Sequence, residues 1–157
     1  MIELLYWTLW VSEMPDCVLD ATVVAMANGN IAGRRPGNAF DRRLRVVEQV
    51  VRGTLRLRYN SKLLGEYLPL VQEFRNDVIE VFFTLLVDRG VLVKRNTLSR
   101  QGHAIAVKRC RWPSHDQHLL AAALGGMEPA LFVTEMLHDT CGACIYRNLA
   151  IRVERLD

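Results

Sequence analysis

The sequence lacks the features of several protein classes. It has no large excess of charge of one sign, since 20 basic and 17 acidic residues leave a net charge of +3. Its ten glycines and five prolines are too few for a fibrous or low-complexity protein. No apolar run reaches the about 20 residues that a membrane-spanning helix needs, so we expect no membrane partner. What is present is 157 residues, half of them hydrophobic, which is the length of one domain with a substantial core.

Cysteines and targeting signals are also scarce. The four cysteines are too few for a disulfide scaffold in a chain of this length. The apolar residues 1–14 contain Glu3 and Glu13 but no lysine or arginine, whereas a secretory signal has a basic start and small residues at its cleavage site. We therefore expect a cytoplasmic protein whose cysteines are reduced.

A motif near the C-terminus carries three potential metal ligands. His138, Cys141 and Cys144 have the spacing H-x-x-C-x-x-C, which suits zinc, and a C-x-x-C pair also occurs in redox sites. No adjacent pair of cysteines or histidines offers a fourth ligand. We therefore favour the alternative that the motif holds no metal and that its cysteines are small apolar residues packed on a helix near Ile145.

Apolar patterns divide the chain into alternating strands and helices. We assign residues 1–16 to an N-terminal apolar segment and residues 17–157 to a single domain, because no repeat or linker separates two domains. Short apolar runs predict strands at residues 17–20, 55–59, 91–93, 130–134 and 149–153. Helical spacing predicts helices at residues 22–27, 41–51, 61–71, 77–89 and 114–124. This alternation is typical of an α/β fold, in which a parallel sheet carries helices on both faces.

Two residues bear on the ends of the third predicted helix. Ser61 is a suitable N-cap for it. Pro69 lies inside its apolar pattern, where a proline ends or kinks a helix.

Three acidic residues occupy positions where such a sheet builds ligand sites. Asp20 ends the first strand, Glu66 follows the second strand on a helix, and Asp116 opens the helix before the fourth strand. Each acid alone would be assigned to a helix cap or a solvated surface. Ligands of open parallel sheets, however, bind outside the carboxyl ends of the strands. Carboxylates that converge there repel one another unless a hard cation such as Mg²⁺ or Mn²⁺ lies between them, so the pattern predicts a metal site.

The residues around these acids resemble a known family. The segments VLDATVV, NSKLLGEYLPLV and WPSHDQHLLAAALGG, followed by ALFVT, are similar to the PIN domain, a family of Mg²⁺- or Mn²⁺-dependent ribonucleases. The resemblance covers residues 17–139. It implies a three-layer α/β/α sandwich with a central parallel sheet, and it makes Asp20, Glu66 and Asp116 the metal ligands.

The fourth acidic position departs from the family pattern. Family members often carry Thr-x-Asp or Ser-x-Asp after the fourth strand, whereas this chain has Thr134-Glu135-Met136. Glu135 or Asp139 is the candidate replacement, assisting through water. The departure leaves open whether the site is fully active and whether it holds one metal ion or two.

Basic residues form two groups, at residues 34–58 and at residues 89–111. Arginine suits phosphate because its planar guanidinium donates two parallel hydrogen bonds. We favour the second group for contact with an RNA backbone, because it lies next to Asp116 and surrounds residues 96–102, which we expect to be flexible. The candidate RNA-binding residues are Arg95, Arg100, Arg109 and Arg111.

These patterns and the resemblance together predict a Mg²⁺- or Mn²⁺-dependent endoribonuclease. The resemblance fits the toxin of a toxin–antitoxin pair, which would add an antitoxin protein as partner, and equally a stand-alone nuclease. The apolar composition and the N-terminal tryptophans predict a homodimer. The alternative is a degenerate PIN fold that binds RNA or protein without cutting, which Met136 favours. A doubly wound domain for another phosphate ester has less support, because the glycine-rich phosphate-binding fingerprints are absent.

Overall fold

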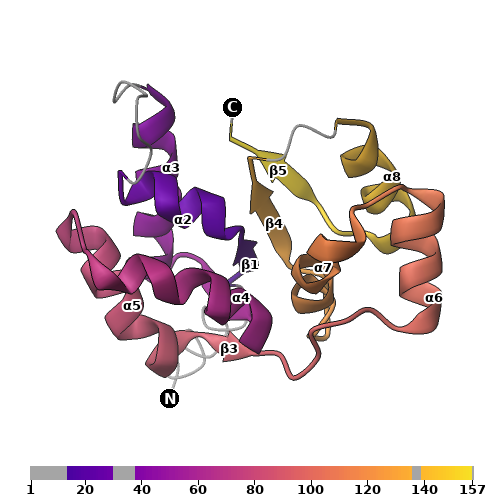
Figure 1. Ribbon diagram of the computed structural model, residues 1–157, viewed down its shortest axis with the longest axis horizontal. Coiled ribbons are helices and arrows are strands. Elements are labelled where there is room, and N and C mark those ends of the chain that lie inside the picture. The colour runs from indigo at the N-terminus through magenta and orange to yellow at the C-terminus, as the bar shows by residue number, and fades with distance from the viewer. Residues whose placement is uncertain (1–13, 30–37, 136–138, 157) are drawn as a thin grey trace, which may run out of the picture.

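One parallel sheet between two layers of helices forms the fold (Figure 1). The computed structural model describes residues 14–29, 38–135 and 139–156. The five strands in these ranges are all parallel and run in the order β3-β2-β1-β4-β5. They are β1 (Asp16–Leu19), β2 (Arg56–Tyr59), β3 (Val91–Leu92), β4 (Leu131–Thr134) and β5 (Val153–Arg155).

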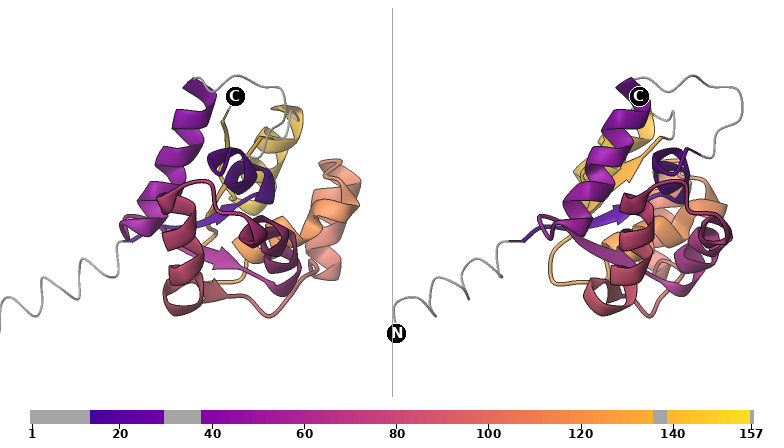
Figure 2. Two further views of the ribbon diagram at one scale, coloured as in Figure 1. Left: turned by 60° about the vertical axis from the view of Figure 1, so that its left-hand side comes forward. Right: turned by 90° about the vertical axis from the view of Figure 1, so that its left-hand side faces the viewer.

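The helices fall on the two sides of this sheet. Those of the described ranges are α2 (Ala21–Ala27), α3 (Asn38–Val51), α4 (Ser61–Tyr67), α5 (Asp77–Arg89), α6 (Arg100–His103), α7 (Gln117–Ala123) and α8 (Asp139–Leu149). Figure 1 shows α3 and α5 on one side of the sheet and α6, α7 and α8 on the other, and the turned views of Figure 2 keep this separation. The predicted three-layer α/β/α sandwich is therefore confirmed. Within the same ranges, no helix is long and apolar enough to cross a membrane.

The central strand β1 is also the centre of the core. Cys17 pairs with Leu57 of β2, and Val18 pairs with Phe132 of β4. All four side chains are buried, as is Leu19 at the end of the strand. A strand covered on both faces needs apolar residues at successive positions, which is why β1 reads as a continuous apolar run and not as an alternating one.

An ion-pair network holds the starts of β1 and β2 together. Asp16 accepts hydrogen bonds from Nε of Arg56 at 2.7 Å and from Nε of Arg58 at 2.5 Å. Burial acts to raise the pKa of Asp16, but the hydrogen bonds from the two arginines outweigh it and hold the pKa below its usual value. Arg58 also donates to the carbonyls of Ala123 and Glu128, so it ties the loop after α7 to the sheet.

Two predicted helix and strand boundaries are wrong. Asn60, not Ser61, is the N-cap of α4, because its side-chain oxygen accepts the N–H of Leu63 at 3.1 Å. The last strand is β5 instead of residues 149–153, because α8 continues to Leu149 and Ala150 then takes a positive φ of 56°. The expectation for Pro69 is confirmed, since α4 ends at Tyr67 and a 3₁₀ helix, Leu68–Gln72, carries the proline in its first turn.

The segment 96–102, which we expected to be flexible, leads into a helical segment that begins at Arg100. Ser99 caps α6 by accepting the N–H of Gly102 at 3.1 Å, and a π-helical stretch, Ala104–Arg109, continues it. The sequence analysis predicted no helix here, because the segment is short and its apolar residues follow no clear helical period.

The prediction that all four cysteines are reduced is wrong in this structure. Cys110 and Cys144 form a disulfide between the end of the π-helical stretch and α8. Cys17 and Cys141 are free and buried, and the Cys141 thiol donates to the Cys110 carbonyl at 3.1 Å. Cys110 lies 34 residues before Cys144 and outside the H-x-x-C-x-x-C motif, so spacing alone could not reveal the pair. Because Cys144 is bonded to Cys110, it is not available as a zinc ligand.

We predict that this disulfide contributes to stability. Closing a loop of 34 residues restricts the unfolded chain, so reduction should lower the free energy of unfolding by about 3–4 kcal/mol. Thermal unfolding with and without a phosphine reductant measures the loss, and Cys110→Ser with Cys144→Ser should reproduce it. A Cys141→Ala variant serves as control, because it should keep the full response to reductant. Four reactive thiols in the denatured, unreduced protein would contradict the prediction.

Candidate functional site

Asp20 lies where the connections of the sheet change direction. From β1 the chain first adds β2 and β3 on one side and then β4 and β5 on the other. Ligands of such sheets bind at this point, outside the carboxyl ends of the two diverging strands, here β1 and β4. Asp20 follows β1 directly, and its side chain is buried. One carboxylate oxygen accepts the Thr134 hydroxyl at 3.0 Å from the end of β4, and the other accepts the N–H of Thr22 at 3.5 Å. Both contacts limit the orientations of the carboxylate.

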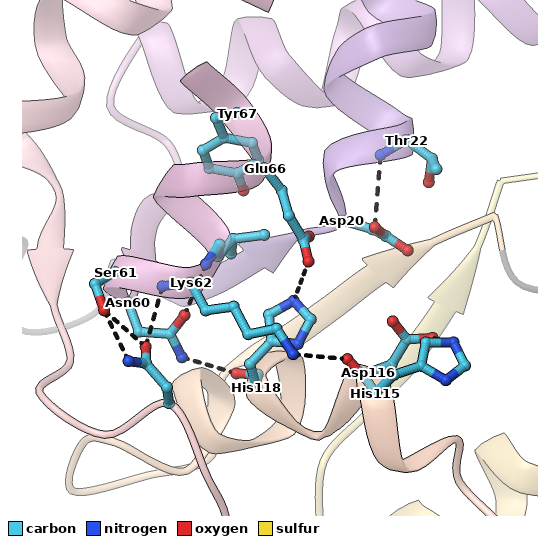
Figure 3. Close-up of polar contacts among 12 residues, drawn as sticks. Asp20, Thr22, Asn60, Ser61, Lys62, Glu66, Tyr67, His115, Asp116 and His118 are labelled. Atoms are coloured by element: carbon cyan, nitrogen blue, oxygen red, sulfur yellow. Dashed lines mark hydrogen bonds and ion pairs between the residues drawn. The ribbon is translucent and has the colours of Figure 1, made fainter. Parts of the chain in front are cut away.

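The charges of the other two predicted acids act on Asp20 and contribute to its pKa. Burial raises this pKa above its usual value, while the hydrogen bonds from Thr134 and Thr22 act to lower it. The charges of Asp116 and Glu66 raise it further. The three acids come from residues that are far apart in the sequence, yet they are close enough to repel one another. Figure 3 shows their side chains arranged around one region, each from a different element.

Glu66 is positioned by buried hydrogen bonds on either side of it. Asn60, fully buried, starts the helix and also donates to the carbonyls of Arg95 and His118 at 3.1 and 2.9 Å. Tyr67, next to Glu66, is fully buried and donates its hydroxyl to the carbonyl of Leu19. These bonds join α4 to the end of β1 and to α7. The Glu66 carboxylate itself is partly exposed and available to a ligand.

His118 is a residue of this site to which sequence reasoning assigned no role. It lies on α7, and its ring is completely buried. Its Nε2 is 2.8 Å from Oε1 of Glu66, although the direction of the contact is not that of a hydrogen bond. Among the described residues, Nδ1 of the ring has no hydrogen-bond partner. The signal in the sequence is one polar residue at the start of an apolar helix, two positions after Asp116.

Asp116 ends a short 3₁₀ helix, Ser114–Asp116, and directly precedes α7. Its side chain makes no capping bond to the helix, so the carboxylate is not consumed by the role that the sequence suggested for it. It lies 3.4 Å from Nε2 of the exposed His115. The backbone carbonyl of Asp116 accepts the indole N–H of Trp112 at 3.0 Å, which fixes the turn that carries the acid.

Lys62 brings a positive charge to the acids. It lies four residues before Glu66 and thus on the same face of α4. Its ammonium donates to the carbonyl of His115 at 3.0 Å, and Figure 3 shows the side chain reaching from α4 toward the turn of Asp116. Sequence reasoning did not select Lys62, because it belongs to neither basic group.

The remaining candidate acids are placed less favourably. Glu135 follows β4 but forms an ion pair with Arg43 of α3, and both side chains are largely buried. Its charge is therefore already neutralised. Asp139 begins α8, but its side chain, like Met136, lies outside the part of the chain that the structure describes.

The predicted RNA-binding arginines are all exposed, and they belong to different segments of the chain. The backbone of Arg95 touches the site through Asn60, and Arg111 lies five residues before Asp116. Arg100 and Arg109 lie on the helical segment outside α7, where Arg109 donates to Asn148 at 3.3 Å.

The donor set has the chemistry of a site for a hard cation. Asp20, Glu66 and Asp116 offer carboxylate oxygens, which Mg²⁺ and Mn²⁺ prefer. Burial first, and then the charges of Asp116 and Glu66, raise the pKa of Asp20, and a cation would favour its charged form. In the described ranges, however, no three His, Cys, Asp or Glu side chains are close enough together to enclose a metal ion. Each of the three carboxylates instead faces a protein partner, Thr134, His118 or His115. A cation would have to draw the carboxylates away from these contacts.

Comparisons with models of protein families, with curated proteins and with solved structures found no match to this chain. What the site does is therefore argued from its residues.

We predict that Asp20 destabilises the metal-free protein at neutral pH. Its pKa is raised on folding, so the folded state holds this proton more tightly than the unfolded state does. Stability from this group is present below the ordinary pKa of Asp, 3.8, and is lost as pH rises through the raised folded value. Asp20→Asn should therefore be more stable than the wild type at pH 7, with the difference shrinking toward pH 3.

Urea unfolding at a series of pH values in chelator measures this difference. Asp88→Asn, which removes an exposed acid from α5, is the matched control and should change little. An Asp20→Asn variant that is less stable than the wild type at pH 7 would show that the Asp20 carboxylate is held by attraction and not by repulsion.

Proposed function

We propose that the chain is a Mg²⁺- or Mn²⁺-dependent endoribonuclease of the PIN type. The observation that carries the proposal is that Asp20, Glu66 and Asp116 lie around one region at the carboxyl ends of β1 and β4, close enough for the charges of Glu66 and Asp116 to act on Asp20 (Figure 3). Three carboxylates that repel one another at a ligand-binding edge are typical of a site for a divalent cation.

The residues of the site suit the hydrolysis of a phosphodiester. Asp20, Glu66 and Asp116 would hold the cation, which supplies a water-derived nucleophile near neutral pH and neutralises charge on the phosphate. Lys62 is placed to bind a phosphate oxygen beside these acids. His118 contacts Glu66 from its buried side and limits the orientations of that carboxylate. Thr134 holds Asp20 in the same way.

The partners follow from this function. The substrate is RNA, with a second phosphate contact at Arg95, Arg100, Arg109 or Arg111. A homodimer is also proposed, because Leu68, Val71 and Phe74 expose large apolar side chains, and light scattering of the full chain decides its presence. An antitoxin protein as partner is proposed from the resemblance of the sequence, and a cytoplasmic location is proposed from the composition of residues 1–14.

A second function, a degenerate PIN fold that binds without cutting, is favoured by one observation. Glu135, the candidate fourth acid in the described chain, is paired with Arg43 and cannot serve as a free carboxylate without breaking a largely buried ion pair. The two functions share metal binding and differ in cleavage.

We predict that Mn²⁺ stabilises the protein and supports cleavage of a mixed RNA pool. At a hundred times the dissociation constant, binding should add about 2.7 kcal/mol to the free energy of unfolding. Asp20→Asn, Glu66→Gln and Asp116→Asn should each lose both effects while remaining folded, because each removes one charge and keeps the shape. Asp88→Asn should keep both.

The two functions give different results in this experiment. Glu135→Gln should cleave RNA but lose stability, because Arg43 is left without its partner carboxylate. Stabilisation of the wild type by Mn²⁺ without any cleavage would favour the binding module. Cleavage by Asp20→Asn at the wild-type rate would remove the metal site altogether.

We predict that Lys62 contacts phosphate. Each phosphate contact contributes about 0.7 to the slope of log affinity against log salt for a single strand, so Lys62→Ala should lower the slope by about that amount. The double variant Arg109→Ala with Arg111→Ala tests the outer arginines in the same way. Arg89→Ala, at the opposite edge of the sheet, is the control. An unchanged slope for Lys62→Ala would place the phosphate contact elsewhere.

A further inference from the structure

An apolar cavity opens at the edge of the sheet opposite the candidate site. It has a volume of about 310 Å³ and lies between α3, β2 and α5. Its walls are aliphatic and aromatic side chains, among them Val50, Leu55, Phe82 and Leu86. Apolar cavities of about 150 Å³ already accept a molecule the size of benzene, so this one has room for two large side chains.

The mouth of the cavity is formed by the beginning of the described chain and by arginines. Met14 is one of the lining residues, so residues 1–13 leave the described chain at the mouth itself. Arg56 and Arg89 also line the cavity. Arg56 is already paired with Asp16, whereas Arg89 at the end of α5 is exposed and offers its charge to a ligand.

We propose that residues 1–13 of the same chain dock in this cavity. The segment, MIELLYWTLWVSE, has nine apolar residues out of thirteen, including Trp7 and Trp10. Its only charged side chains are Glu3 and Glu13, and both are acidic. Segment and cavity are therefore complementary in two ways, since apolar side chains meet apolar walls and acids meet a basic mouth.

The connection at Met14 favours the segment of the same chain over other occupants. A segment tethered at the mouth of its binding site has an effective concentration in the millimolar range, so a weak apolar contact is enough to fill the site. Docking there removes the apolar walls from water and leaves the candidate site around Asp20 untouched. The inference therefore does not depend on the proposed function, and Asp20→Asn should not alter the docking.

Tryptophan fluorescence of the full chain tests the proposal. The chain has three tryptophans, and Trp112 is buried in the core, so the difference between the wild type and a Trp7→Phe, Trp10→Phe variant reports on the segment alone. Docking predicts that acrylamide quenches this signal several-fold less than it quenches a free peptide of residues 1–13. Quenching equal to that of the peptide overturns the proposal.

Charge reversal locates the docking at this cavity. Arg89→Glu should increase the quenching by shifting the docked population up to about fivefold, the effect expected of an exposed charge pair. Adding Glu13→Arg should restore protection. Arg147→Glu makes the same change of charge on an exposed position of α8 and should have no effect. Protection that is unaffected by Arg89→Glu would place the segment on another surface, and protection that is lost on dilution to the monomer would assign it to a second copy; either result overturns the proposal.

Discussion

The pairing of β1 with a parallel strand on each side is the constraint on which the other features of this protein depend. Because β1 lies between β2 and β4, its residues Cys17, Val18 and Leu19 are covered on both faces and both edges, and all three are apolar. The same pairing brings the carboxyl ends of β1 and β4 together. It therefore determines that Asp20 and Thr134, 114 positions apart in the sequence, form a hydrogen bond at one edge of the sheet.

Hydrogen bonds near the carboxyl ends of the strands position the residues of the candidate site. Tyr67 bonds to Leu19, and each of these residues is the direct neighbour of a candidate ligand, Glu66 or Asp20. Asn60 joins the start of α4 to α7, the helix that Asp116 precedes. These bonds bring together carboxylates that repel one another, and this repulsion adds to burial in raising the pKa of Asp20. Repulsion held in place by neighbouring bonds is typical of functional sites, where local electrostatics are unfavourable without the ligand.

The carboxyl ends and the amino ends of the parallel strands have opposite electrostatic characters. At the carboxyl end, acids gather with little compensation apart from Lys62. At the other end, Asp16 is compensated by two arginines, and its pKa is held low instead of high. The apolar cavity lies at these amino ends as well, and its lining includes Arg56 and Arg89.

The sequence by itself determined the class of the fold and the position of the three acids along it. Continuous apolar runs identified β1 and β4, an alternating pattern identified β2, and a helical period identified α5, because burial on two faces and on one face leave different local patterns. They also placed Asp20, Glu66 and Asp116 at strand ends and helix starts. Local patterns wrongly predicted the N-cap at Ser61 and the last strand at residues 149–153. The observed boundaries depend on one side-chain hydrogen bond, from Leu63 to Asn60, and on one backbone angle, the positive φ of Ala150.

Only the tertiary structure decided which distant residues meet. The contact of His118 with Glu66, the disulfide of Cys110 with Cys144 and the pairing of Glu135 with Arg43 join segments whose separation carries no periodic signal. Lys62 entered the site for the same reason, since its role depends on a turn 53 residues away. Periodicity records the environment of a residue on its own helix or strand, whereas the identity of its partner is set by the packing of the whole sheet.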